Sequence, residues 1–153
     1  MTIKFGTDGW RGIVGNDFTL KNIRRCANGT ANLLKEQGLE SNGLIVGYDT
    51  RETSEASAMA VTKTVVDTGI NVYLCNKATP TPVVSYNVVS RNAGAGVIIT
   101  ASHNSNDWNG FKYKPNYGGS ASPKITERLE TLINENRQAE NVALISPNEA
   151  EKF

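Results

Sequence analysis

The feature that most constrains the fold is a regular alternation of short β-branched apolar runs with longer stretches of helical periodicity. The apolar runs occupy residues 44–46, 70–74 and 97–99. They show little of the polar–apolar alternation of a half-exposed strand, which is typical of strands buried on both faces of a parallel sheet. Residues 111–114 predict one more strand after a long polar loop.

Four helices are predicted between and after these strands. The first keeps its apolar residues at helical spacing from Leu20 to Leu34, and Gly38 is placed to end it. Gly29 lies inside this helix, where glycine is unfavourable, so we expect the helix to approach another backbone closely there. The other helices are predicted at about residues 55–68 with Ser54 as N-cap and Gly69 as terminator, after Thr81-Pro82, and after Ser122-Pro123.

Strands that alternate with helices predict an α/β fold, here a three-layer α/β/α sandwich with a mixed, mostly parallel sheet. The chain has 153 residues, and no linker, repeat or low-complexity segment divides it. A single domain over residues 1–153 is therefore expected.

Composition argues against several classes of partner. The net charge is +1, from 16 basic and 15 acidic residues, so no broad positive field favours nucleic acid or an anionic membrane. No signal-peptide pattern and no apolar run of membrane-spanning length is present. Cys26 and Cys75 lack the spacing of a metal site, and free thiols are typical of a reducing, cytoplasmic setting.

Four polar segments rich in glycine or proline carry the candidate chemistry. They are FGTDGWRG at residues 5–12, GYDTR at 47–51, TPTP at 79–82 and TASHN at 100–104. Three of them directly follow a predicted strand, and ligands of open α/β sheets bind beyond the carboxyl ends of the strands. We therefore expect these loops to meet at one sheet edge. Arg51 is predicted to brace the serine-containing loop, with a surface ion pair to Asp49 or Glu52 as the alternative.

The segment around Ser102 is the most informative, because an amide-rich loop and a lysine follow it. Asn104, Asn109 and Lys112 are predicted to hold an anion such as phosphate. Ser102 could then act as a nucleophile. His103 is the only histidine, but adjacent side chains of extended backbone point apart, which disfavours a Ser–His couple. The alternative is that Ser102 and Asn104 merely cap a turn.

Together the four segments resemble the α-D-phosphohexomutases, the family of phosphoglucomutase, phosphomannomutase and phosphoglucosamine mutase. TASHN followed by NGFK at residues 109–112 resembles the active-site serine loop, and FGTDGWRG resembles the N-terminal signature. The other two segments match the next landmarks in the same order, and the resemblance extends to about Ile133. Ser105 stands where the family usually has proline, and Trp108 where tyrosine is common. The resemblance implies that the chain is the first of four domains.

The resemblance also implies a phosphoserine mechanism that interconverts hexose 1-phosphate and hexose 6-phosphate. Ser102 would donate a phosphoryl group to the sugar phosphate, giving a bisphosphate, and then recover the other phosphoryl group. Arg11 and Lys112 would bind the reacting phosphoryl and hydroxyl groups, while His103 and Asn104 would line the same loop. Lys112 is the first candidate for general acid/base, and His103 is the second.

The implied cofactors are Mg²⁺ and a sugar bisphosphate activator such as glucose 1,6-bisphosphate. Ser102 would bind Mg²⁺ through its phosphate, while three aspartates of a second domain would supply the other protein ligands. The implied partners are a hexose phosphate and the remaining domains, without which the chain is expected to be inactive. Glucose, mannose and glucosamine phosphates all remain open as substrates. The residues also leave two other functions open, namely a phosphosugar-binding module without turnover and a regulatory phosphoprotein modified at Ser102 by a kinase.

Overall fold

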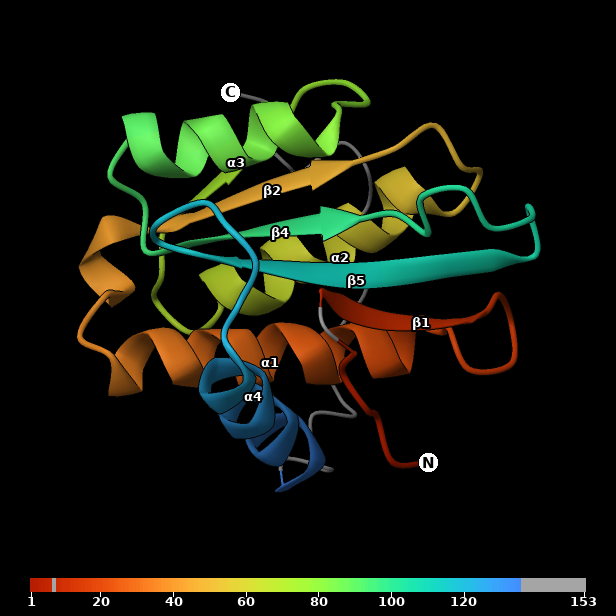
Figure 1. Ribbon diagram of the computed structural model, residues 1–153, viewed down its shortest axis with the longest axis horizontal. Helices are drawn as coiled ribbons and strands as arrows, with labels where there is room; N and C mark the ends of the chain where they lie inside the picture. Colours follow the sequence, from red (N-terminus) through yellow and green to blue (C-terminus); the bar gives the residue numbers. More distant parts are fainter. Residues whose placement is uncertain (7, 136–153) are drawn as a thin grey trace.

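Strands and helices alternate along the chain in the computed structural model, which describes residues 1–6 and 8–135 (Figure 1). In chain order the elements are β1 (Gly9–Ile13), α1 (Leu20–Glu36), a 3₁₀ helix (Glu40–Asn42), β2 (Leu44–Tyr48), α2 (Ser54–Val66), β3 (Val72–Leu74), α3 (Thr81–Ser90), β4 (Ala95–Ile99), β5 (Trp108–Pro115) and α4 (Pro123–Glu135). Of the helices that the structure describes, none has the length and apolarity that crossing a bilayer requires.

The strands form a five-stranded mixed sheet in the order β1-β5-β4-β2-β3. β2 pairs in parallel with both β3 and β4, whereas β5 runs antiparallel to β4 on one side and to β1 on the other. Among the described strands, β5 alone therefore runs against the common direction. This confirms the predicted mixed, mostly parallel sheet.

Helices cover both faces of the sheet and make three layers (Figure 1). Leu44 and Val46 of β2 belong to the larger apolar core, which also contains side chains of α1, α2 and α4. Ile45, which points to the opposite face, packs in a second cluster with Val84 and Val88 of α3. The predicted α/β/α sandwich is therefore confirmed, with three helices on one face and α3 on the other.

The N-terminal signature contains a strand that the sequence pattern did not predict. β1 is an edge strand whose residues alternate between buried and exposed, and its glycines hide the β-type pattern. Gly9 pairs with Lys112, and a Cβ at Gly9 would lie 2.3 Å from the carbonyl oxygen of Phe111. A side chain there would prevent this close pairing. β5 is likewise longer than the four residues predicted for it.

The helix ends agree with the sequence except at the starts of α2 and α3, where Thr81, expected before the helix as its cap, is instead the first residue of α3 and Pro80 takes the capping position. α1 ends at Glu36, just before Gly38, and α4 begins at Pro123 as predicted. Ser54, predicted as a cap, is instead the first residue of α2, and the capping position falls to Thr53. The Ser54 hydroxyl donates to Asp49, so it bonds to the loop after β2 instead of capping its own helix.

α1 and α4 pack closely where α1 contains Gly29. A Cβ at Gly29 would lie 2.4 Å from Cγ1 of Ile133 and 3.1 Å from its backbone nitrogen. The predicted close approach of this helix to another backbone is therefore confirmed, and its partner is α4. Glycine is kept here at a cost in helix propensity because it lets the two helices touch.

We predict that Gly29→Ala destabilises the domain by about 1–3 kcal/mol, because the added methyl overpacks the α1–α4 contact and outweighs the better helix propensity of alanine. The measurement is the free energy of unfolding in urea. Asn32→Ala is the matched control, since Asn32 is a half-buried position of the same helix, and this change improves propensity without the clash at Ile133. A Gly29→Ala protein at least as stable as the parent would contradict the packing argument.

Candidate active site

The loop that carries Ser102 connects β4 to the antiparallel β5, at the edge where β2 also ends (Figure 1). The Thr100 amide donates to the Gly110 carbonyl at 3.0 Å, which closes the base of the loop. Ser102 is exposed and has a positive φ of 57°, a left-handed conformation that costs a residue with a side chain about 1–3 kcal/mol. Its amide donates to the Thr100 hydroxyl at 2.9 Å. Such a conformation persists only where the surroundings enforce it.

Arg51 supplies that enforcement from the loop after β2. Its guanidinium donates hydrogen bonds of 2.7 to 3.1 Å to four carbonyl oxygens of the serine loop. The acceptors are the carbonyl groups of Ser102, Asn104, Ser105 and Trp108. The remaining donor, Nε, bonds the Asp49 carboxylate at 3.2 Å. All three nitrogens of the guanidinium group are therefore held by hydrogen bonds. The predicted bracing role and the ion pair are both present.

Asn109 belongs to a buried network, which corrects its predicted role in phosphate binding. Its side chain is 0% exposed, and its amide nitrogen donates to the hydroxyls of Ser54 at 2.9 Å and Thr53 at 3.0 Å. Its amide oxygen accepts from the Gly110 amide at 2.8 Å. Ser54 in turn donates to Asp49 at 2.6 Å. A fully buried amide engaged on both ends cannot touch a ligand, so Asn109 supports the loop from below.

Two of the predicted cations share one face of the sheet beside the loop. Arg11 of β1 pairs with Gly110, and Lys112 of β5 pairs with Gly9. Side chains two residues apart on a strand point to the same face, and directly paired residues also share a face. The carbonyl of Gly110 accepts the hydrogen bond from Thr100 that closes the serine loop. Since Arg11 is the β1 residue paired with Gly110, the exposed Arg11 lies at the base of that loop. Lys112 lies one step further along the same face, with 12% of its side chain exposed.

Asp8, which the sequence analysis did not single out, links two lysines on that face. Its carboxylate accepts from Lys112 at 3.0 Å and from Lys114 at 2.7 Å, one lysine to each oxygen. Burial raises the pKa of Asp8, but the hydrogen bonds and charges of Lys114 and Lys112 outweigh it and hold the pKa below its ordinary value. The sequence offered one signal for this cluster. Lys112 and Lys114 are spaced i, i+2 on a predicted strand, which places them on one face, and the N-terminal signature contains an acidic residue.

His103 and Asn104 lie in the same turn as Ser102, as the sequence predicted for this loop. His103 is exposed, whereas Asn104 is half-buried. The Asn104 amide donates to the Ala101 carbonyl at 3.2 Å, which closes the turn, and its carbonyl is one of those bound by Arg51. The backbone of Asn104 thus fixes the shape of the loop, whatever its side chain binds.

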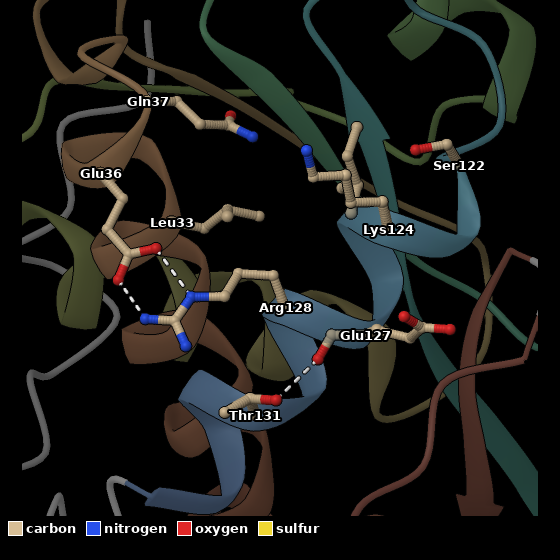
Figure 2. A pocket seen from close by; sticks show the side chains of 9 residues that line it. Leu33, Glu36, Gln37, Ser122, Lys124, Glu127, Arg128 and Thr131 are labelled. Carbon is tan, nitrogen blue, oxygen red and sulfur yellow. Dashed lines mark hydrogen bonds and ion pairs between the residues drawn. The ribbon is translucent and has the colours of Figure 1, made fainter.

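A separate open groove of about 710 Å³ lies between the end of α1 and α4 (Figure 2). An exposed ion pair crosses it, in which Arg128 donates to Glu36 at 2.9 and 2.5 Å. The hydrogen bond from Arg128 holds the pKa of Glu36 below its ordinary value. Its lining residues come from α1 and the residue that follows it, and from α4 and the residue that precedes it, and none belongs to the serine loop.

Comparison with known proteins agrees with this geometry. Residues 2–140 match the family model described as phosphoglucomutase/phosphomannomutase, alpha/beta/alpha domain I. Among curated proteins, the chain is 34% identical over 129 residues to a phosphoglucosamine mutase of Finegoldia magna, covering 84% of this chain and 28% of that protein. It is 32% identical over 134 residues to a phosphoglucosamine mutase of Acetivibrio thermocellus, covering 88% of this chain and 30% of that protein.

Solved structures give the same picture. A putative phosphomannomutase from Thermus thermophilus superposes with a TM-score of 0.84 at 33% identity, covering 94% of this chain and 32% of that one. The phosphoglucomutase parafusin of Paramecium superposes with a TM-score of 0.78 at 23% identity, covering 86% of this chain and 25% of that one, which shows a common fold. The chain spans less than a third of the length of these relatives. It belongs to the phosphoglucomutase/phosphomannomutase family and corresponds to the α/β/α domain I of that family.

Proposed function

We propose that this chain is the phosphoserine-carrying domain of a phosphohexomutase, with Ser102 as the residue that accepts and donates the phosphoryl group. The observation that carries the proposal is the serine loop itself. Ser102 is exposed in a left-handed conformation, and Arg51 bonds four carbonyls of the loop. Relatives named phosphoglucosamine mutase and phosphomannomutase support the same class of reaction.

In the proposed reaction, the bond between phosphorus and Ser102 Oγ breaks as a hydroxyl oxygen of a hexose monophosphate bonds to phosphorus. The proton of that hydroxyl is released, and Ser102 Oγ takes up one proton. The product is a hexose bisphosphate. After the bisphosphate reorients, its other phosphoryl group returns to Ser102 by the reverse chemistry, which leaves the isomeric monophosphate. Catalysis of such a transfer rests mainly on positioning and on neutralising charge.

Arg11 and Lys112 are the residues that we assign to charge neutralisation. A phosphoserine carries about −1.5 to −2 charges near neutral pH, so cations beside it are needed. Arg11 is exposed at the base of the loop, and Lys112 uses one donor on Asp8 while keeping two others for phosphoryl or hydroxyl oxygens. Proton transfer is assigned to Lys112 first and to His103 second, and the Asn104 side chain is assigned to phosphate binding.

The described residues would supply only some of the oxygen ligands that Mg²⁺ needs. Within residues 1–6 and 8–135, no group of three or more His, Cys, Asp or Glu side chains could hold a metal ion. Ser102, once phosphorylated, would offer oxygen ligands of the kind that Mg²⁺ prefers. We therefore propose that the other protein ligands come from outside this domain. When bound, the ion would neutralise charge on the transferring phosphoryl group.

The whole protein is proposed to contain further domains that complete the site. The chain spans 28–32% of the length of the mutases it resembles at 32–34% identity, which leaves room for sugar selection and for a clamp on the second phosphate. Its substrate would be a hexose phosphate, its activator a sugar bisphosphate such as glucose 1,6-bisphosphate, and its location the cytoplasm. The free thiols of Cys26 and Cys75 suit a reducing compartment.

The first prediction from the proposed function concerns Ser102. In the longest natural protein that contains this chain, Ser102→Ala should abolish the phosphoenzyme and lower mutase kcat by more than about 1,000-fold, because the acceptor oxygen is lost. The measurements are intact mass after incubation with glucose 1,6-bisphosphate, and a coupled assay. Ser105→Ala is the matched control, since Ser105 is an exposed serine of the same loop. Loading by a kinase and ATP but not by the bisphosphate would favour the regulatory phosphoprotein instead.

The second prediction concerns Arg51. Arg51→Lys should lower kcat by about 10–100-fold, since a lysine cannot span four carbonyls and a small displacement of the nucleophile is costly. The rate of Ser102 phosphorylation should fall with it. Arg128→Lys is the control, because it weakens an exposed ion pair in the groove between α1 and α4 and should leave the rate unchanged. Full activity in Arg51→Lys would show that the brace does not position Ser102.

The third prediction is that the domain alone does not complete the reaction. Ser102 is exposed, and the described residues supply too few metal ligands, so a phosphoryl group would be open to water and incompletely neutralised. The test is a coupled assay of the isolated chain with Mg²⁺, glucose 1-phosphate and a trace of glucose 1,6-bisphosphate, beside the longer natural protein. Sustained glucose 6-phosphate formation that disappears in Ser102→Ala would contradict the prediction.

A further inference from the structure

The sheet face beside the serine loop holds a charge cluster that the proposed chemistry uses only in part. We define the Asp8 bridge as the carboxylate of Asp8 with the two ammonium groups that it bonds, those of Lys112 and Lys114. The proposed reaction assigns a task to Lys112 alone. Asp8 and Lys114 are close enough to affect that task, and their burial and geometry indicate how.

The backbone is shaped to deliver Asp8 to both lysines. Lys112 and Lys114 are two residues apart on β5, so they project from the same face of the sheet. Gly9, which follows Asp8, pairs directly with Lys112 at a separation that no side chain would allow. The Gly6 amide also donates to the Gly9 carbonyl at 2.8 Å. The absence of a side chain at Gly9 therefore allows the chain next to Asp8 to approach β5 closely.

Both lysines of the Asp8 bridge are largely buried. Lys114 has 8% of its side chain exposed and Lys112 has 12%, whereas Asp8 has 33% exposed. Lys114 donates to one carboxylate oxygen at 2.7 Å, the shorter of the two bonds, and Lys112 donates to the other oxygen at 3.0 Å. A lysine side chain is otherwise flexible, with four rotatable bonds to its ammonium group. The hydrogen bond to Asp8 restricts that freedom. It uses one of the three N–H donors of Lys112 and thereby fixes the direction of the other two.

We propose that Asp8 is a positioning residue that fixes the ammonium group of Lys112 for phosphoryl transfer, with Lys114 as its buried anchor. This inference rests on the proposed function, because it assumes that Lys112 contacts the reacting groups. The three charges sum to +1, so the bridge keeps a net positive charge toward the substrate while a carboxylate orders it. Arg11, on the same face, adds a further positive charge that Asp8 does not neutralise.

A mere surface ion pair is the competing explanation, and a double-mutant cycle separates the two. The variants are Asp8→Asn, which keeps the shape but removes the charge, Lys112→Met, and the double variant, all in the longest natural protein that contains this chain. If Asp8 acts through Lys112, Asp8→Asn lowers kcat by about 10–100-fold in the parent and by less than about twofold in the Lys112→Met background. KM should change much less than kcat.

The pH profile adds a second readout. The pKa of Asp8 lies below its ordinary value, so its carboxylate stays ionised as the pH falls to about 5. Between about pH 6 and 9 no titration of Asp8 itself therefore contributes to the loss in Asp8→Asn, and any pH dependence of that loss should arise through Lys112 and disappear in the Lys112→Met background. A pH-dependent loss that persists in the Lys112→Met background would mean that Asp8 takes part in proton transfer, and it would overturn a positioning role.

Matched variants complete the test. Asp67→Asn removes another carboxylate that bonds a lysine, Lys63 at 2.9 Å, on the exposed surface of α2, and it should leave kcat unchanged. Lys114→Met should reproduce part of the Asp8→Asn loss, since it removes the anchor. Asp8→Asn at parental kcat, or an equal loss in both backgrounds of the cycle, would overturn the inference. A parent protein with neither mutase activity nor a phosphorylated Ser102 would overturn the proposed function instead, which keeps the two failures distinct.

Discussion

The guanidinium group of Arg51 is the interaction on which the candidate site depends. It joins the loop after β2 to the loop after β4 by donating hydrogen bonds to four carbonyl oxygens. The left-handed conformation of Ser102 costs about 1–3 kcal/mol, and a hydrogen bond to a charged group contributes about 1.5–3 kcal/mol when it is shielded from water. Arg51 has only 13% of its side chain exposed, so one or two of these bonds match the strain.

Support for the loop continues below it in a network of polar side chains that bond one another. Asp49 receives the Nε of Arg51 and the hydroxyl of Ser54, and Ser54 receives the amide of the fully buried Asn109. Removing one member of such a network would leave a buried polar group unpaired, which costs more than the bond itself contributes. The start of α2, the end of β2 and the start of β5 are thus held together beneath the nucleophile.

Charge and nucleophile are supplied by different parts of the fold. The serine loop is set by Arg51 at the edge of the sheet, whereas Arg11 and Lys112 are set by the antiparallel register of β1 and β5 on one face. The pairing of β1 with β5 thereby places the N-terminal signature next to the serine loop, which lies about 90 residues further along the chain. The groove between α1 and α4 takes no part in this arrangement (Figure 2).

The sequence by itself determined the layers, the central parallel strands, the helices and the identity of the serine loop, because hydrophobic periodicity and segment order are local properties of the chain. Only the tertiary structure decided the strand β1, whose glycines have low β propensity and become a strand by pairing with β5. It also decided the role of Asn109, since an amide has the same appearance in sequence whether it faces a ligand or is buried. The Asp8 bridge joins residues more than 100 positions apart, and no local pattern encodes the register that brings a carboxylate to two lysines.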